Sequence, residues 1–295
     1  MPEPALLLLA AAFLVVGALY SSVGHAGASG YLAVMALAGV SASLMRPTAL
    51  SINVLVAVIA SVQFWRAGHF RWRLFWPFAA ASMPAAFLGG KITLPSAALQ
   101  GAIGAVLVLS AIQMTWTGWR RAATARERAA RPPRPPPLWA ALAVGAALGF
   151  VAGLTGTGGG IFLSPLLVIA GWAGLRETAA TSAVFILVNS LAGLAGIVGG
   201  GWTPVPGLPI LAAAAVCGGV VGSQLGSRML GDRALRTTLA AVLLLAGGKL
   251  VVQAATPAAQ PPARTEPGPG GASPRTAALP ASQHGRFQIG TSRFS

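Results

Sequence analysis

Apolar residues run along this chain in blocks of about 20, and charged residues fall almost entirely between the blocks. A hydrophobic run of roughly 20 residues is long enough to cross a bilayer as a helix. The charge-free run 178–227 exceeds one span, and the sequence GGGWTPVP at 199–206 divides it into two. Ten segments are predicted: 4–23, 28–45, 48–65, 73–91, 98–118, 138–154, 158–174, 178–199, 206–228 and 235–254.

Composition places the chain among integral membrane proteins. It is 55% hydrophobic and 8% charged, whereas about a quarter of the residues in a soluble domain are charged. The five acidic residues lie at segment ends, in a connecting loop or in the C-terminal region. We therefore expect an all-α polytopic membrane protein, multi-pass in the cell inner (plasma) membrane and surrounded by the lipid bilayer.

Glycine interrupts one of the uncharged segments. The block GLTGTGGG, residues 153–160, lies inside a stretch without charge from 135 to 175. Glycine loosens a helix and exposes its backbone. Exposed backbone at membrane depth is tolerated only where protein buries it or where it lines a watery cavity. The block predicts a broken or re-entrant helix at a polar site, and close helix packing through small residues is the alternative.

The two halves of the chain resemble each other. The block GHAGASG at 24–30 aligns with the glycine block from 153 onward, and Trp72 falls opposite Trp202. Glycine-broken segments at corresponding places in two repeats are typical of transporters. We predict a first repeat at 1–118 and a second at 138–254. A basic, proline-rich connector at 119–137 joins them, and a disordered tail follows at 255–295.

Arginine distribution predicts the orientation of the repeats. Short cytoplasmic loops carry excess Lys and Arg, which places the connector in the cytoplasm. Five segments per half then give two inverted repeats with an exterior amino terminus. Loops near Arg71 and Arg233 fall inside, and their poorly charged counterparts fall outside. In the alternative, segments 28–45 and 158–174 are re-entrant, which leaves eight spans and parallel halves.

The paired glycine blocks also resemble a known family. The blocks GHAGASG and GLTGTGGGIFLSPLL, with the AATS run at 179–182, are similar to those of the sulfite exporter TauE/SafE family, also called the 4-toluene sulfonate uptake permease family. The resemblance covers roughly residues 5–254. It implies a secondary transporter, or permease, of small sulfur-containing anions such as sulfite or organosulfonates. The first half departs from the pattern, since Tyr31 replaces a glycine and Ala36 stands opposite Pro165.

An anion at membrane depth needs hydrogen-bond donors, which helix N-termini, glycine backbone and hydroxyl groups supply. Asparagine amides inside apolar segments need partners and serve either a ligand or an interhelix bond. His25, the one histidine inside an apolar block, is a candidate proton relay, with a structural role as the alternative. The candidate substrate-binding residues are Thr155, Thr157, Gly158, Gly159, Gly160, Gly27, Ser29, Gly30, Asn53 and Asn189.

Other classes of function fit the sequence poorly. The net charge of +15 comes from arginines between apolar blocks, so no nucleic-acid partner is expected. Cys217 is the single cysteine and the histidines are scattered, so we expect no metal site, no cofactor and no catalytic residues. The alternatives are a non-transporting membrane subunit of a larger assembly and a transporter of another small organic anion. The direction of transport, the coupling ion and a homo-oligomeric state stay open.

Reporter fusions test the predicted orientation. Inverted repeats place a reporter after Arg134 in the cytoplasm and a reporter after Ala255 outside. Alkaline phosphatase activity and fluorescence of a green fluorescent protein measure the two sides. A cytoplasmic signal after Ala255 would contradict the ten-segment arrangement and favour eight spans.

Overall fold

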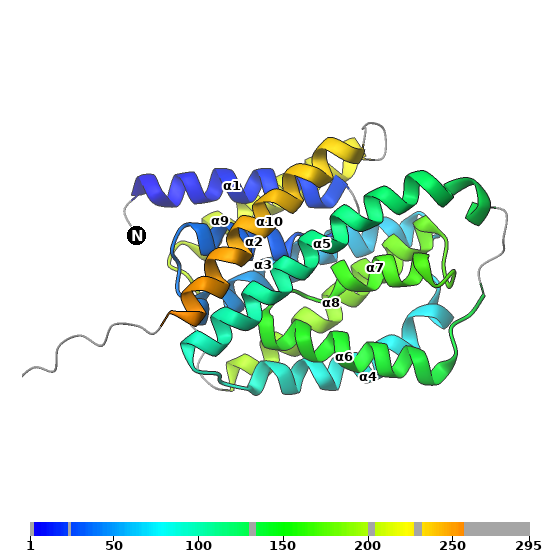
Figure 1. The fold of residues 1–295 in the computed structure, drawn as a ribbon, viewed down its shortest axis with the longest axis horizontal. Helices are drawn as coiled ribbons and strands as arrows, with labels where there is room; N and C mark the ends of the chain where they lie inside the picture. The colour runs from blue at the N-terminus through cyan, green and yellow to red at the C-terminus, as the bar shows by residue number, and fades with distance from the viewer. Residues whose placement is uncertain (1–2, 23–24, 130–133, 200–203, 227–231, 257–295) are drawn as a thin grey trace, which may run out of the picture. The chain divides into compact units, whose positions relative to one another are not determined.

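The computed structural model describes residues 3–22, 25–129, 134–199, 204–226 and 232–256, and its regular elements are all α-helices. In chain order (Figure 1), the helices are α1 (Glu3–Ser22), α2 (Ala28–Leu37), α3 (Ala42–Arg66), α4 (Trp72–Lys91), α5 (Ser96–Ala129), α6 (Leu138–Thr155), α7 (Gly160–Ile169), α8 (Leu175–Val198), α9 (Leu208–Gly226) and α10 (Asp232–Ala255). The predicted disordered tail lies almost wholly outside the described residues.

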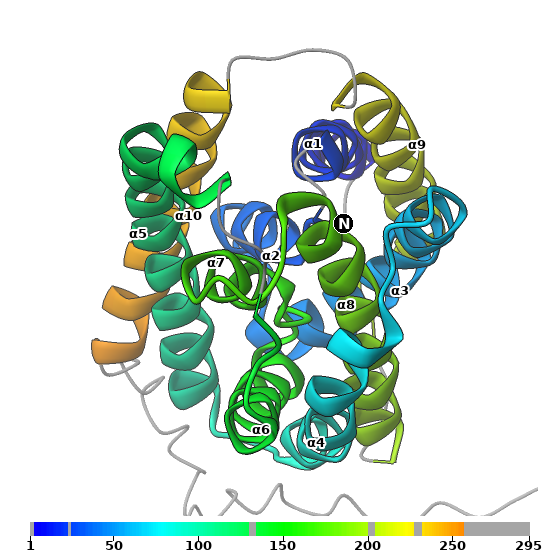
Figure 2. The same ribbon diagram turned by 90° about the vertical axis from the view of Figure 1, so that its right-hand side faces the viewer.

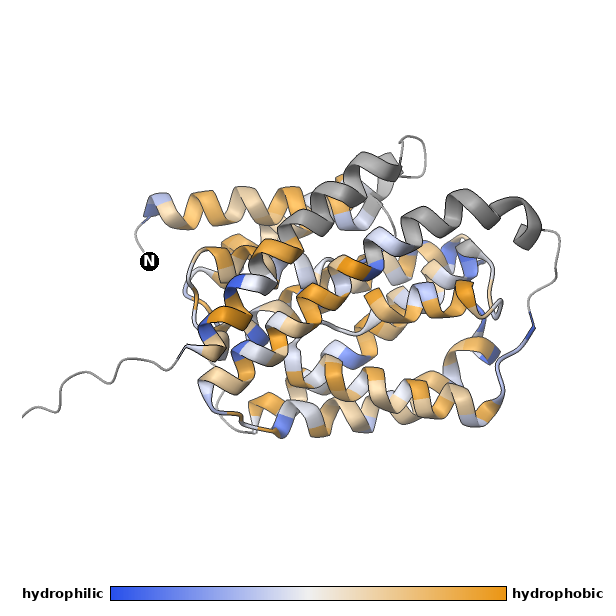
Figure 3. Ribbon diagram, in the orientation of Figure 1, coloured by the Kyte–Doolittle hydropathy of each residue, from blue (hydrophilic) through white to orange (hydrophobic). Residues whose placement is uncertain are grey.

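Five helices in the described part of the chain are long and apolar enough to cross a membrane. They are Glu3–Ser21, Ala42–Arg66, Ser96–Gln113, Leu138–Thr155 and Arg176–Val198. Large apolar side chains face outward on several helices, with Leu8 at 75% and Trp139 at 75% exposure. Apolar positions dominate the helices in Figure 3. The predicted all-helical, multi-span architecture is confirmed at this level, with five helices rather than ten meeting both criteria.

Two helices are much shorter than the predicted segments. The segments 28–45 and 158–174 contain helices of only 10 residues, α2 and α7. Each is about 15 Å long, half of the roughly 30 Å hydrocarbon layer. Both end at a glycine with left-handed backbone, Gly39 at φ 78° and Gly171 at φ 69°. The N–H of Val40 then donates to the Met35 carbonyl, and Trp172 N–H to the Leu167 carbonyl. This closing turn ends a helix whatever the hydrophobicity beyond it.

The helix α5 is longer than predicted. It continues to Ala129, well into the residues expected to form the connector. Alanine, arginine and glutamate dominate residues 120–130 and are strong helix formers. The helix therefore extends past the apolar segment that defined its predicted end.

Glycine allows two pairs of helices to touch through their backbones. A side chain on Gly145, Gly149 or Gly153 of α6 would collide with the backbone of Phe78, Ser82 or Ala86 of α4, respectively. Both series advance by four residues, so α4 and α6 run parallel. In the same way, Gly218 and Gly222 of α9 meet Leu14 and Ala18 of α1. Small residues permit such close approach in membranes.

These two helix pairs lie at opposite edges of the bundle. Figure 2 shows α4 with α6 at one edge and α1 with α9 at the other, while α5 packs along α10 at the side. The short helices α2 and α7 lie in the interior. Buried apolar side chains form two clusters, one that includes most of α2 and one that includes Leu163 and Leu167 of α7.

The helix α8 packs against both halves. It runs antiparallel to α3, since Ser190 meets Asn53 and Gly193 meets Leu50. It also runs antiparallel to α7, since Ser182 meets Ser164 and Ile186 meets Gly160.

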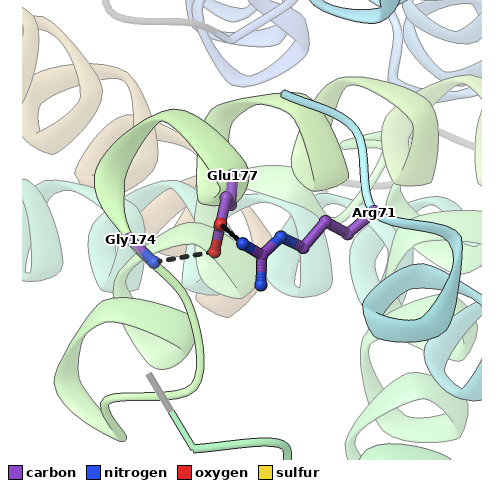
Figure 4. Close-up of polar contacts among 3 residues, drawn as sticks. All are labelled: Arg71, Gly174 and Glu177. Carbon is purple, nitrogen blue, oxygen red and sulfur yellow. Dashed lines mark hydrogen bonds and ion pairs between the residues drawn. The ribbon is translucent and has the colours of Figure 1, made fainter. Parts of the chain in front are cut away.

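At its start, α8 is joined to the residue preceding α4. Arg71 Nη2 lies 2.7 Å from Glu177 Oε1, and the Gly174 N–H donates to Glu177 Oε2 at 3.3 Å (Figure 4). Glu177 therefore closes the first turn of α8 and pairs with a cation of the other half. Arg71 is mostly exposed, so the pair contributes little stability, about 0–1 kcal/mol. Because α4 and α8 meet again at Gly90 and Gly193, these two helices run parallel.

Candidate functional site

The break between α6 and α7 is built from glycines that hold left-handed backbone. Gly156, Gly158 and Gly159 have φ of 83°, 72° and 75°. Most residues with a side chain are strained in this region, which explains the density of glycine here. The predicted broken helix at 153–160 is therefore present, and the turn reverses the chain between α6 and α7.

The two threonines of the break are buried and bond locally. Thr155 Oγ1 donates to the Val151 carbonyl at 2.6 Å, and its oxygen lies 3.1 Å from Thr157 Oγ1. The Thr155 hydroxyl thus makes a structural hydrogen bond within its own helix, which is common for threonine. Because the Thr155 hydrogen is already donated to Val151, Thr157 is the donor to Thr155, and an anion would have to replace that bond to accept from Thr157.

The turn faces polar side chains from both halves of the chain. A Cβ on Gly158 would collide with Asn53 Nδ2 of α3 and lie 3.2 Å from Ser190 Oγ of α8. Asn53 Nδ2 itself donates to Ser190 Oγ at 3.0 Å. Gly159 lies against the Phe185 ring, where its Cβ would approach to 3.1 Å. The fold thus brings together Asn53 and Gly158, two predicted site residues that are far apart in the sequence.

Two buried amide oxygens beside this turn have no hydrogen-bond partner within the described residues. They are Asn53 Oδ1 and Asn189 Oδ1, on side chains that are 0% exposed. Asn189 Nδ2 donates to the Phe185 carbonyl at 2.9 Å, and the ring of Phe185, one turn earlier on α8, contacts Gly159. An unsatisfied buried polar atom costs about 1–3 kcal/mol, so native proteins usually supply a water or a ligand. Both amides therefore indicate a site that takes a polar guest.

Donors come from the start of α7. The first N–H groups of a helix have no partner inside the helix, and they form its partly positive end. The residue that precedes α7 is Gly159, and no side chain caps this terminus. Gly158, Gly159 and Gly160 leave the backbone without covering side chains. The uncapped helix start is suited to an anion. The amide oxygens of Asn53 and Asn189 are acceptors, so they suit a water or another hydrogen-bond donor.

The glycines of the first half have different surroundings. Gly27 has φ 94° and lies against the Tyr31 ring, and Gly30 packs on Tyr20 and Val16. Ser29 Oγ donates to the Tyr20 hydroxyl at 3.0 Å. These predicted site residues therefore pack against the aromatic side chains of their own half. His25 lies between α1 and α2, where its backbone N–H donates to the Tyr20 carbonyl at 3.0 Å.

Three polar residues near these helix ends were not predicted from the sequence. Ser190 bonds Asn53 and follows Asn189, but a serine in a helix carries little signal. Arg46 is buried in the first turns of α3, with 6% exposure, and Lys249 of α10 bonds the Ala36 and Leu37 carbonyls at the end of α2. Arg46 is the one Lys, Arg, Asp or Glu between Glu3 and Arg66, and this isolation was a readable signal.

Comparisons with known proteins identify the family of the chain. A model of the sulfite exporter TauE/SafE family matches residues 9–250, which confirms the resemblance found in the glycine blocks. A protein of Sinorhizobium fredii (strain NBRC 101917 / NGR234), named "Probable membrane transporter protein y4hK", is 43% identical over 244 residues. The match covers 82% of this chain and 97% of that protein. No solved structure matches the chain.

Substitutions in the turn separate a ligand site from simple packing. Thr157→Val removes one hydroxyl at nearly constant shape, so a bound anion should lose about ten- to a hundredfold in affinity, or roughly 1.5–3 kcal/mol. Gly159→Val should abolish binding because its side chain would meet Phe185 and cover the start of α7. Melting temperature and sulfite affinity, by calorimetry on purified protein, measure both.

The matched control for the second change is Gly171→Val. Gly171 has nearly the same backbone, φ 69°, but a Cβ there meets nothing within 4 Å. It should therefore lose stability through backbone strain yet keep sulfite affinity. Normal sulfite affinity in well-folded Thr157→Val would show that Thr157 is not part of the binding site. Equal sulfite affinity in Gly159→Val and Gly171→Val would show that the glycine turn is not the binding site.

Proposed function

We propose that this chain, which belongs to the sulfite exporter TauE/SafE family, is a secondary transporter of small sulfur-containing anions such as sulfite or organosulfonates. Membership of the family and the transporter-named relative support the membrane transporter class. The observation that carries the substrate class is the uncapped start of α7, where the glycine backbone supplies N–H donors. A tetrahedral anion presents several acceptor oxygens, which backbone N–H groups and hydroxyls can bind together.

The binding residues we assign are centred on the second-half turn. Gly158, Gly159 and Gly160 provide backbone donors. Thr155 and Thr157 add hydroxyls if substrate replaces their present bonds to Val151 and to each other. Asn53 lies near the middle of α3, so the break between α6 and α7 faces the middle of a long helix rather than its end. Transporter sites formed by discontinuous helices lie near the bilayer midplane. Gly27, Ser29 and Gly30 occupy the matching place in the first half and have a lesser part.

We further propose that the two halves are inverted repeats. The contacts already described give the direction of each helix: α4, α6 and α8 run one way, and α3 and α7 run the other. Thr48 Oγ1 accepts from the Val205 N–H, and Val56 meets Gly219, so α9 and α1 run with α3. Ser29 bonds Tyr20 and Tyr31 stacks on Phe13, so α2 opposes α1.

The fifth pair follows the same rule. Gly101 of α5 meets Ala254 of α10, and Gly104 meets Leu250, so α5 and α10 are antiparallel. Each helix of the first half therefore runs in the opposite direction to the helix that comes five helices later in the chain. This relation supports inversion. The arginine distribution, not the helix directions, is the reason to propose the connector in the cytoplasm and the protein in the plasma membrane. A repeat of opposite orientation lets one fixed site face either side of the membrane in turn.

Flux through the purified protein tests the transport function. Proteoliposomes that contain the full chain should take up sulfite and methanesulfonate down their gradients, whereas liposomes that contain Gly159→Val should not. Acetate serves as the carboxylate comparison for a transporter of other organic anions. Absence of flux for all three anions, from protein that is folded and inserted, would contradict transport and favour a non-transporting subunit.

Proton coupling through His25 has its own test. No Asp or Glu lies inside a predicted span, so His25 is the candidate proton carrier. Methanesulfonate stays ionised between pH 5.5 and 7.5, so changes in its flux report on the protein. Wild-type flux should change across this range, and His25→Gln should flatten the profile. An unchanged profile in His25→Gln returns His25 to a structural role.

A further inference from the structure

Arg46 is the buried cation nearest to the glycine turn in the described residues. Its guanidinium donates from Nη1 to the Ile92 carbonyl at 3.1 Å, and from Nη2 to the carbonyls of Gly89, Gly90 and Gly153 at 3.1, 3.1 and 3.0 Å. Every one of these acceptors is a backbone oxygen in or just beyond the last turn of α4 or α6. Arg46 therefore joins three helices from both halves.

The helices that Arg46 caps end side by side. Because α4 and α6 run parallel and touch through Gly153 and Ala86, their C-terminal carbonyls gather at one place. Each helix C-terminus carries roughly half a negative elementary charge. The two ends together carry about one negative charge, and a single guanidinium balances it. A strained or unpaired backbone is thereby avoided at a buried position.

This balance acts directly at the break. A broken helix places the negative end of its first half beside the positive end of its second half. A ligand at the turn would feel the partial charges of both helix ends, which have opposite signs. Arg46 binds the Gly153 carbonyl of α6, and its own Cα lies 3.1 Å from the position of a Cβ on Gly156. The cation thus cancels the α6 end and leaves the N-terminus of α7 as the dominant charge.

We propose that Arg46 is a positioning residue that makes the glycine turn selective for anions, a role that rests on the proposed function. It acts through the α6 and α4 carbonyls rather than by contact with the substrate. With Arg46 neutral, the turn keeps its donors, but the negative ends of α4 and α6 are no longer balanced and disfavour a negatively charged guest. The sequence alone would place Arg46 in a loop between two spans, with no relation to the site.

Lys249 provides the matched control. Its Nζ donates to the Ala36 carbonyl at 2.8 Å and the Leu37 carbonyl at 3.1 Å, and so caps the C-terminus of α2. Lys249→Gln removes the same charge and the same type of cap at a different helix end. If Arg46 is only a structural cap, Arg46→Gln and Lys249→Gln should behave alike: both lower the melting temperature and neither changes anion affinity.

The test measures melting temperature and methanesulfonate affinity for the full-length wild type, Arg46→Gln, Arg46→Lys and Lys249→Gln. Arg46→Gln should weaken methanesulfonate binding on the order of tenfold, the effect of one nearby unit charge at an effective dielectric constant of about 20. Arg46→Lys keeps the charge but not the forked geometry, so its affinity should stay within about threefold while its melting temperature falls. Lys249→Gln should keep wild-type affinity.

Two outcomes overturn the role of Arg46 alone: folded Arg46→Gln that binds methanesulfonate as the wild type does, or Arg46→Lys that loses about tenfold. If Arg46→Gln does not fold, the affinity of Arg46→Lys decides by the same criterion. Failure of the wild type to bind either methanesulfonate or sulfite instead contradicts the proposed function itself. The two failures are therefore distinguishable in one set of measurements.

Discussion

Backbone N–H and C=O groups inside a hydrocarbon layer have no water to bond, so each helix end within the membrane needs a partner from the protein. A continuous spanning helix meets this requirement by itself, but a broken helix creates two more ends. This chain breaks twice, before α2 and before α7. Buried polar groups of the protein bond to those extra ends, as Arg46 does at the end of α6.

The ends of the short helices and of α6 are satisfied in different ways. The C-terminus of α6 is met by Arg46 and by the Gly156 N–H, which donates to the Ala152 carbonyl. The C-terminus of α2 is met by Lys249 and by a closing turn at Gly39. At the N-terminus of α7, the capping position is a glycine and no side chain fills it. The N-terminus of α2 at Gly27 also has no side-chain cap, so α7 is distinguished by the buried polar side chains beside its turn, Asn53 and Ser190.

The two halves share a plan but differ in their turns. In the second half, Gly160 leaves room for Ile186 of α8, and Gly158 reaches Asn53 and Ser190. In the first half, Tyr31 stands where Gly160 stands, is fully buried and stacks on Phe13 with ring centroids 4.8 Å apart. The departure from the family pattern at Tyr31 thus has a structural counterpart, because an aromatic ring occupies the space beside Gly27. We therefore expect binding to depend mainly on the second half.

The sequence by itself determined that the chain is a helical membrane protein of the TauE/SafE family, and it located the breaks, because hydrophobic length and glycine density are local properties. It also singled out Asn53, Asn189 and Gly158, since a polar group in an apolar run is visible without coordinates. It placed the ends of α2, α5 and α7 wrongly, because a closing turn or a favourable run of alanine and arginine decides where a helix stops. Only the tertiary structure decided that Asn53 of α3 meets Gly158 and Ser190, and that Arg46 caps two helices far away in sequence. Those pairings depend on which helix faces pack together, and the pattern of a single segment does not contain that information.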